Sequence, residues 1–79
     1  MCLIDMSSAF VLLNCVIGSE ITVIDELNKM NGVSALRVSG IYDVIAKLGE
    51  ASKEEIGDQV RKIRYIGHVR SSLTMIVAK

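Results

Sequence analysis

Hydrophobic and polar residues alternate with two different periods along the chain. Residues 9–16 are apolar at almost every position, which is typical of a central strand buried on both faces. The next segment, GSEITVIDELNKMNG, has helical spacing and predicts a helix at about residues 19–30. We expect Ser19 to cap this helix and Asn31-Gly32 to end it in a left-handed turn.

Two further strands follow, joined by a short turn. The segment VSALRVS at residues 33–39 and the segment from Tyr42 to about Gly49 both alternate with a period of two, with Gly40-Ile41 between them. This pattern predicts a hairpin. In its second strand we expect one face to hold Val44, Ala46 and Leu48 and the other to hold Asp43, Ile45 and Lys47.

The last third of the chain predicts a helix and then a strand. Ser52 and Glu55 match a capping box, and the apolar spacing behind them predicts an amphipathic helix that ends near Tyr65, with Gly67 as its stop. Residues 68–78 return to strand alternation. We expect one face of this strand to hold Val69, Leu73, Met75 and Val77 and the other to hold Ser72, Thr74 and Ile76.

The order strand, helix, strand, strand, helix, strand predicts an α+β, ferredoxin-like βαββαβ fold, with a four-stranded antiparallel sheet and two helices on one face. We expect a short leader at residues 1–8 and one domain at 9–79. A chain this short buries only about 60–65% of its unfolded surface. Because the first strand is apolar on both faces and no residues remain to cover the second, we expect a homodimer of the dimeric α/β barrel type.

Composition and charge narrow the class of protein. The chain is 51% hydrophobic, which argues against disorder, and nine Lys and Arg balance nine Asp and Glu, which argues against direct nucleic-acid binding. Five basic residues are clustered in the sequence. They are Lys53, Arg61, Lys62, Arg64 and Arg70. A solvated helix face is the ordinary interpretation of such a cluster, and a local basic patch is the alternative.

The cysteines and the absence of long apolar runs bear on location. Cys2 and Cys15 lack the spacing of a zinc site or a disulfide framework, so we expect a buried Cys15 and an exposed Cys2 thiol. The chain has no secretory signal pattern and no apolar run long enough to cross a membrane. We therefore expect a cytoplasmic protein that does not enter a membrane.

The chemistry available for catalysis is sparse. His68 is the single histidine, with no carboxylate at a metal-ligand spacing, and the glycines form no phosphate-binding loop. We therefore predict no catalytic residue, no metal and no cofactor, and a protein that is not an enzyme.

The remaining polar side chains lie at turns and strand starts. Gly40, Tyr42 and Asp43 stand at the predicted hairpin turn, and Ser72 and Thr74 share one face of the last strand. An amino acid needs an anion for its ammonium group and donors for its carboxylate, and these residues offer both. The alternative is structural: Tyr42 packs, Asp43 accepts turn N–H groups, and the two hydroxyl residues are good strand formers.

Three segments resemble a known family. The sequences VLLNCVIGSEITVIDELNKMNGV, VSGIYDVIAKL and VRKIRYIGHVRSSLTMIV, between about residues 9 and 77, look like the effector-binding (RAM) domain of Lrp/AsnC feast/famine transcription regulators. The resemblance is most specific at the G-x-Y-D turn, where Gly40, Tyr42 and Asp43 stand, and at the strand with Ser72 and Thr74. It implies that these five residues line an amino-acid pocket at contacts between dimers, and that dimers assemble into octamers or decamers.

A full regulator of this family carries a helix-turn-helix domain before the module, so the resemblance implies a stand-alone module without its own DNA-binding domain. Our first hypothesis is an amino-acid sensing and oligomerisation module. The second is an interaction protein that binds no ligand and modulates full-length Lrp/AsnC regulators by forming mixed oligomers. The third and least favoured is an enzyme on a related scaffold.

Overall fold

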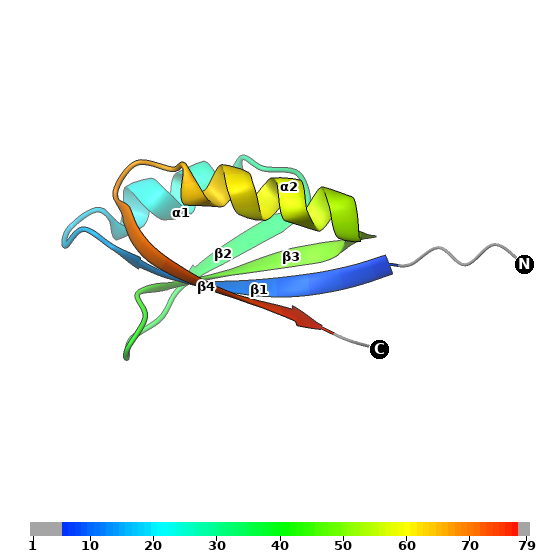
Figure 1. The fold of residues 1–79 in the computed structure, drawn as a ribbon. Coiled ribbons are helices and arrows are strands. Elements are labelled where there is room, and N and C mark those ends of the chain that lie inside the picture. Colours follow the sequence, from blue (N-terminus) through cyan, green and yellow to red (C-terminus); the bar gives the residue numbers. More distant parts are fainter. Residues whose placement is uncertain (1–5, 78–79) are drawn as a thin grey trace, which may run out of the picture.

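The computed structural model describes residues 6–77, in which four strands form one antiparallel sheet. The elements are β1 (Met6–Cys15), α1 (Glu20–Asn28), β2 (Val33–Arg37), β3 (Val44–Ser52), α2 (Lys53–Arg64) and β4 (Val69–Val77). The strand order is β2-β3-β1-β4, and both helices lie on one face of the sheet (Figure 1). The predicted ferredoxin-like α+β fold is confirmed.

The core lies between the sheet and the helices. The inward-facing residues of β1 and β3 alternate with outward-facing ones, as the period of two requires. The strand residues that are fully buried are Ala9, Val11, Leu13, Val44, Ala46 and Leu48, each 0% exposed. The helices contribute Val23 and Leu27 from α1 and Ile56 and Ile63 from α2. Burying each such aliphatic side chain contributes about 1.5–3 kcal/mol, so this layer holds the helices on the sheet.

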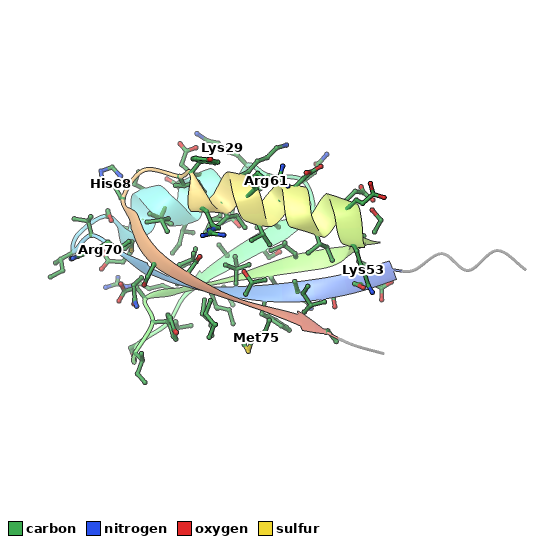
Figure 2. The ribbon with its side chains drawn as sticks, viewed as in Figure 1. Lys29, Lys53, Arg61, His68, Arg70 and Met75 are labelled. Carbon is green, nitrogen blue, oxygen red and sulfur yellow. The ribbon has the colours of Figure 1, made fainter. Side chains whose placement is uncertain are left out.

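The other face of the sheet is not covered within the described chain. Strand pairing places Leu36 of β2 opposite Ile45 of β3, Ile45 opposite Leu12 of β1, and Leu12 opposite Leu73 of β4. We call these four residues the apolar row. The side chain of Met75, in β4, also points away from the helices (Figure 2). The apolar row therefore crosses the whole sheet on the side that the helices leave open.

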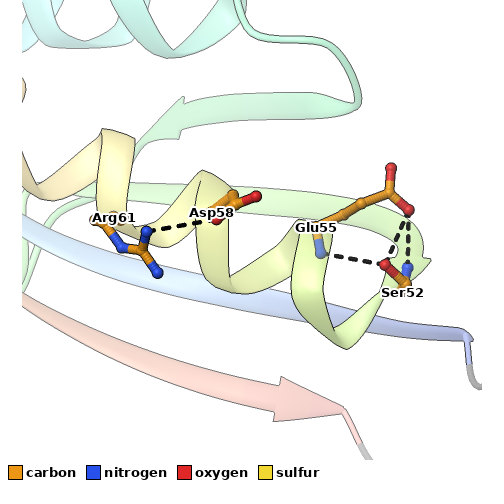
Figure 3. Close-up of polar contacts among 4 residues, drawn as sticks. All are labelled: Ser52, Glu55, Asp58 and Arg61. Atoms are coloured by element: carbon orange, nitrogen blue, oxygen red, sulfur yellow. Dashed lines mark hydrogen bonds and ion pairs between the residues drawn. The ribbon is translucent and has the colours of Figure 1, made fainter.

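The two helices begin in different ways. At α2, the Glu55 N–H donates to Ser52 Oγ and the Ser52 N–H donates to Glu55 Oε1, both at 3.2 Å, so the predicted capping box is confirmed (Figure 3). At α1, Ser19 is the N-cap residue, as predicted, but its side chain makes no capping hydrogen bond. Its hydroxyl donates back to the Val16 carbonyl and closes the turn before the helix.

The helix ends match expectation in part: α2 ends at Arg64, as predicted, and Gly32 after α1 has the predicted left-handed φ, of 76°. Helix α1 ends at Asn28, before the expected stop, and Asn28 Oδ1 accepts the Ala35 N–H at 3.0 Å, which ties the helix end to β2. After α2, the left-handed residue is His68, with φ of 76°, so the prediction of Gly67 as the stop was wrong. The turn from α2 into β4 thus depends on a non-glycine residue in a sparsely populated conformation.

One strand residue lies on the other face from the one predicted. Asn14 pairs with Ser71 but Cys15 pairs with Val69, so Arg70 is an extra residue in β4, a β-bulge. Val69 therefore packs against the core and does not share the face of Leu73. Strand β1 begins at Met6, before the expected start at residue 9, and Ala78 lies outside the described residues.

Candidate functional site

The loop between β2 and β3 is longer than the predicted two-residue turn. The Val38 N–H donates to the Asp43 carbonyl at 2.9 Å and closes the loop, and Gly40 has a φ of 142° that other residues rarely adopt. Strand β3 begins at Val44, so the prediction that it starts at Tyr42 was wrong. The loop extends past the sheet on the side away from the helices (Figure 1).

Asp43 is bonded to the neighbouring strand β1. Its N–H donates to the Leu13 carbonyl at 2.9 Å, and its Oδ2 accepts the Cys15 N–H at 3.0 Å. The carboxylate thus satisfies a backbone donor at the point where β1 ends. Within residues 6–77 the other carboxylate oxygen, Oδ1, makes no hydrogen bond, which leaves it available to a ligand.

A hollow of about 460 Å³ lies beside this carboxylate. It is lined by Asn14, Cys15, Asp43, Arg70 and Ser71. Asn14 Nδ2 donates to Ser71 Oγ at 3.3 Å, so the ends of β1 and β4 are joined there by side chains. We call this space the Asp43 hollow. It brings together a carboxylate, a guanidinium and a hydroxyl group, the groups that complement a zwitterion.

Of the five residues proposed from the sequence, Asp43 alone lines this hollow. Gly40 and Tyr42 belong to the same loop as Asp43 but do not line it. Ser72 pairs with Leu13 and Thr74 with Val11, and both are half-buried on the helix side of the sheet. Within one chain, the five residues therefore do not surround a common space.

Sequence reasoning missed Arg70 and Ser71 as neighbours of Asp43. Arg70 was assigned to a basic cluster and Ser71 had no role, because alternation along β4 does not reveal the bulge that sets the register. The adjacent serines at the start of the strand were the one available signal, and the period of two selected Ser72 because it shares a face with Thr74.

The Cys15 thiol is buried, as predicted, and 5% exposed. Burial raises the pKa of this thiol, and the carboxylates of Asp43 and Glu20 raise it further, while a hydrogen bond with Ser19 acts in the opposite direction. The thiol therefore stays neutral at physiological pH. Cys2 lies outside the described residues.

His68 is exposed, and the described part of the chain gives its side chain no hydrogen-bond partner. Among these same residues, no three His, Cys, Asp or Glu side chains gather closely enough to hold a metal ion. None of the helices within residues 6–77 is long and apolar enough to cross a membrane.

The five clustered basic residues do not form one face. Lys53 and Arg70 lie at opposite ends of the molecule (Figure 2). Arg61 forms an exposed pair with Asp58 at 3.6 Å (Figure 3), as expected of a solvated helix face. Arg64 and Arg70 instead line a common hollow with residues at the start of β4.

Comparison with known proteins places the chain in a family. No family model and no curated protein sequence matches it. Among solved structures, the crystal structure of FFRP-DM1 is similar with a TM-score of 0.85 and 30% identity, over 91% of this chain and 99% of that chain. This chain belongs to the Lrp/AsnC family of feast/famine regulatory proteins.

Two further solved structures are similar to this chain. A hypothetical protein from Pyrococcus horikoshii, PHS023, is 29% identical with a TM-score of 0.85, over 92% of this chain and 90% of that one. AsnC from E. coli shares the fold at 19% identity and a TM-score of 0.79, over 96% of this chain and 52% of AsnC. The Lrp/AsnC chain described here thus corresponds to about half the length of AsnC.

Proposed function

We propose that this Lrp/AsnC-family chain is a stand-alone amino-acid sensing and oligomerisation module that binds its effector where dimers meet. The observation that carries the proposal is the Asp43 hollow, in which Asp43 and Arg70 provide opposite charges beside the Ser71 hydroxyl. An α-amino acid carries both charges on neighbouring atoms, so this pairing suits it better than it suits a simple anion or cation.

The proposed pocket is completed by a second copy. Four of the five residues do not line the Asp43 hollow of their own chain. Gly40 and Tyr42 lie in the same loop as Asp43, and Ser72 and Thr74 lie in the same strand as Ser71. In this proposal, the loop of one chain, which extends beyond the sheet, brings Gly40 and Tyr42 to the strand β4 of another. Ligand binding then changes the population of assemblies because the pocket exists in the assembled state alone.

The apolar row supports a homodimer formed through the open face of the sheet. Leu36 is 67% exposed and Leu73 is 46% exposed, although both belong to a continuous line of aliphatic side chains. A second copy of the same sheet would remove this surface from water. In a twofold dimer, the apolar row of one copy would then face the apolar row of the other. An octamer or a decamer built from such dimers is the expected larger assembly.

A second candidate function has its own supporting observation. Asp43 Oδ2 already accepts the Cys15 N–H, so the carboxylate has a structural role even without a ligand. On this alternative, the chain is an interaction protein that binds no effector and forms mixed oligomers with full-length Lrp/AsnC regulators. Catalysis is part of neither proposal.

A thermal-shift screen against the proteinogenic amino acids, with light scattering on the same samples, separates the two candidates. The sensor proposal expects a shift that grows with the concentration of at least one amino acid. Asp43→Asn keeps an acceptor for the Cys15 N–H but removes the charge, so it should abolish that shift and leave the dimer intact. Asp25→Asn is the matched control, because Asp25 is exposed on α1.

A flat screen would reject the sensor proposal. If, in addition, the chain co-elutes with a helix-turn-helix relative of this family on a size-exclusion column, the interaction protein is supported. Loss of the dimer in Asp43→Asn would assign Asp43 a structural role.

A further inference from the structure

Two guanidinium groups lie between the end of α2 and the start of β4, and one of them, that of Arg70, also lines the Asp43 hollow. Arg64 and Arg70 line a hollow of about 250 Å³ together with Val69, Ser71 and Ser72. Two other cations of the described residues have an acidic partner: Arg61 forms an ion pair with Asp58, and Lys29 forms one with Glu26. Within residues 6–77, neither Arg64 nor Arg70 forms an ion pair, so both can bind an external anion.

The chemistry of this hollow suits a phosphate oxyanion. Two guanidinium groups can each offer a pair of parallel N–H donors to phosphate oxygens. The Ser71 hydroxyl accepts from Asn14 Nδ2, and its own proton is free to donate in the opposite direction. Arg70 is the bulge residue of β4, and the bulge places Ser71 and Ser72 beside it in the lining of the same hollow.

An exposed aromatic side chain lies beside the hollow that Arg64 and Arg70 line. A second hollow, of about 360 Å³, is lined by Arg61, Arg64 and Tyr65, so Arg64 belongs to both. Tyr65 is 84% exposed at the end of α2. An exposed ring flanked by guanidinium groups is a stacking surface for a planar, electron-rich ring system.

We propose that this edge of the molecule binds a mononucleotide, with its phosphate between Arg64 and Arg70 and its base on Tyr65. The two hollows share Arg64, so the phosphate and the base of one nucleotide can occupy neighbouring hollows. A long polynucleotide is a poorer match, because the chain has equal numbers of acidic and basic residues and no extended basic surface. The site does not depend on amino-acid binding, although Arg70 and Ser71 border both sites.

Isothermal titration calorimetry with AMP, inorganic phosphate and adenosine tests this assignment. We expect AMP to bind more tightly than phosphate and adenosine not to bind detectably. Arg64→Gln and Arg70→Gln should each weaken AMP binding by about tenfold or more, because each removes a charged hydrogen-bonding partner. Tyr65→Leu should reduce AMP affinity to that of phosphate.

The matched control is Lys62→Gln. It removes the same charge from the same turn of α2. Lys62 lines neither hollow of the proposed site, and the hollow that it does line contains Glu26, Tyr65 and His68. AMP affinity should stay within about twofold of the unmodified protein, since an exposed charge that does not bind the phosphate directly acts weakly. All four positions are exposed, so circular dichroism should show unchanged folding.

Four results would overturn the nucleotide site. Equal weakening by Lys62→Gln would mean a diffuse basic field, and equal affinity for AMP and phosphate would leave Tyr65 without a role. Tighter binding of an oligothymidylate than of AMP would point to single-stranded nucleic acid. An amino acid that displaces AMP, and whose own thermal shift is lost in Arg70→Gln, would make this hollow the carboxylate end of the amino-acid site.

Discussion

The two faces of the sheet contain similar aliphatic residues but differ in what covers them. On the helix face, Leu13 and Leu48 are 0% exposed, whereas on the open face Leu36 is 67% exposed and Leu73 is 46% exposed. Because alternate residues of one strand belong to different faces, Leu12 and Leu13 are neighbours in sequence and yet face different environments. The helix face is completed by the chain itself, whereas the open face stays partly exposed within the described chain.

The sharpest test of this difference is a leucine on each face. Leu48→Ala leaves a cavity in the core, so we expect it to lower the free energy of unfolding by about 2–5 kcal/mol. Leu36→Ala shortens a side chain that is mostly exposed to solvent, so within one chain it should lower the free energy of unfolding far less. Urea denaturation followed by circular dichroism measures both. Equal losses would mean that the two faces are equally buried in solution.

A charge on the open face should act on assembly. Leu73→Asp buries a carboxylate if two sheets meet there, so we expect the dimer dissociation constant to rise by about a hundredfold or more while the chain stays folded. Sedimentation equilibrium measures this. Ile76→Asp is the control, because Ile76 is an exposed residue of the same strand that pairs with Ala9 on the helix side. A dimer unaffected by Leu73→Asp would exclude the open face as the interface.

A smaller effect should follow from the attachment of α2. Ser52→Ala removes the acceptor of the Glu55 N–H in the capping box and should lower the free energy of unfolding by about 1 kcal/mol. The midpoint of thermal unfolding reports the change. Ser34→Ala, at an exposed position of β2, is the comparison and should leave the midpoint almost unchanged.

The smallest effect concerns the pH dependence of Cys15. Its pKa is raised in the folded protein, so the neutral thiol stabilises the fold fully below the unfolded-state pKa, and this contribution is lost as the pH rises through the folded-state pKa. In a Cys2→Ser background, we expect alkylation of Cys15 near neutral pH to be much slower than that of a free thiol.

Mass spectrometry of the alkylated protein measures this rate. Adding Asp43→Asn removes one of the charges that raise the pKa and should speed the reaction modestly. A rate equal to that of an unfolded chain would show that Cys15 is exposed in solution.

The elements of the fold were predictable because each depends on residues close in sequence. The alternation of β3 placed Val44, Ala46 and Leu48 correctly on the buried face, and the spacing of Ser52 and Glu55 located the start of α2. Errors arose where a competing partner or a neighbouring strand decided the outcome. The Ser19 hydroxyl bonds to the Val16 carbonyl, three residues before it, and Val69 changes face because of the bulge at Arg70.

The sequence by itself therefore determined the order of elements, the ferredoxin-like fold and the unburied face of the sheet, because hydrophobic periodicity acts over a few residues. The tertiary structure alone decided that Asp43 bonds to Cys15 and lines one hollow with Arg70. These residues are distant in sequence, and their placement depends on strand register, which one extra residue in β4 is enough to shift.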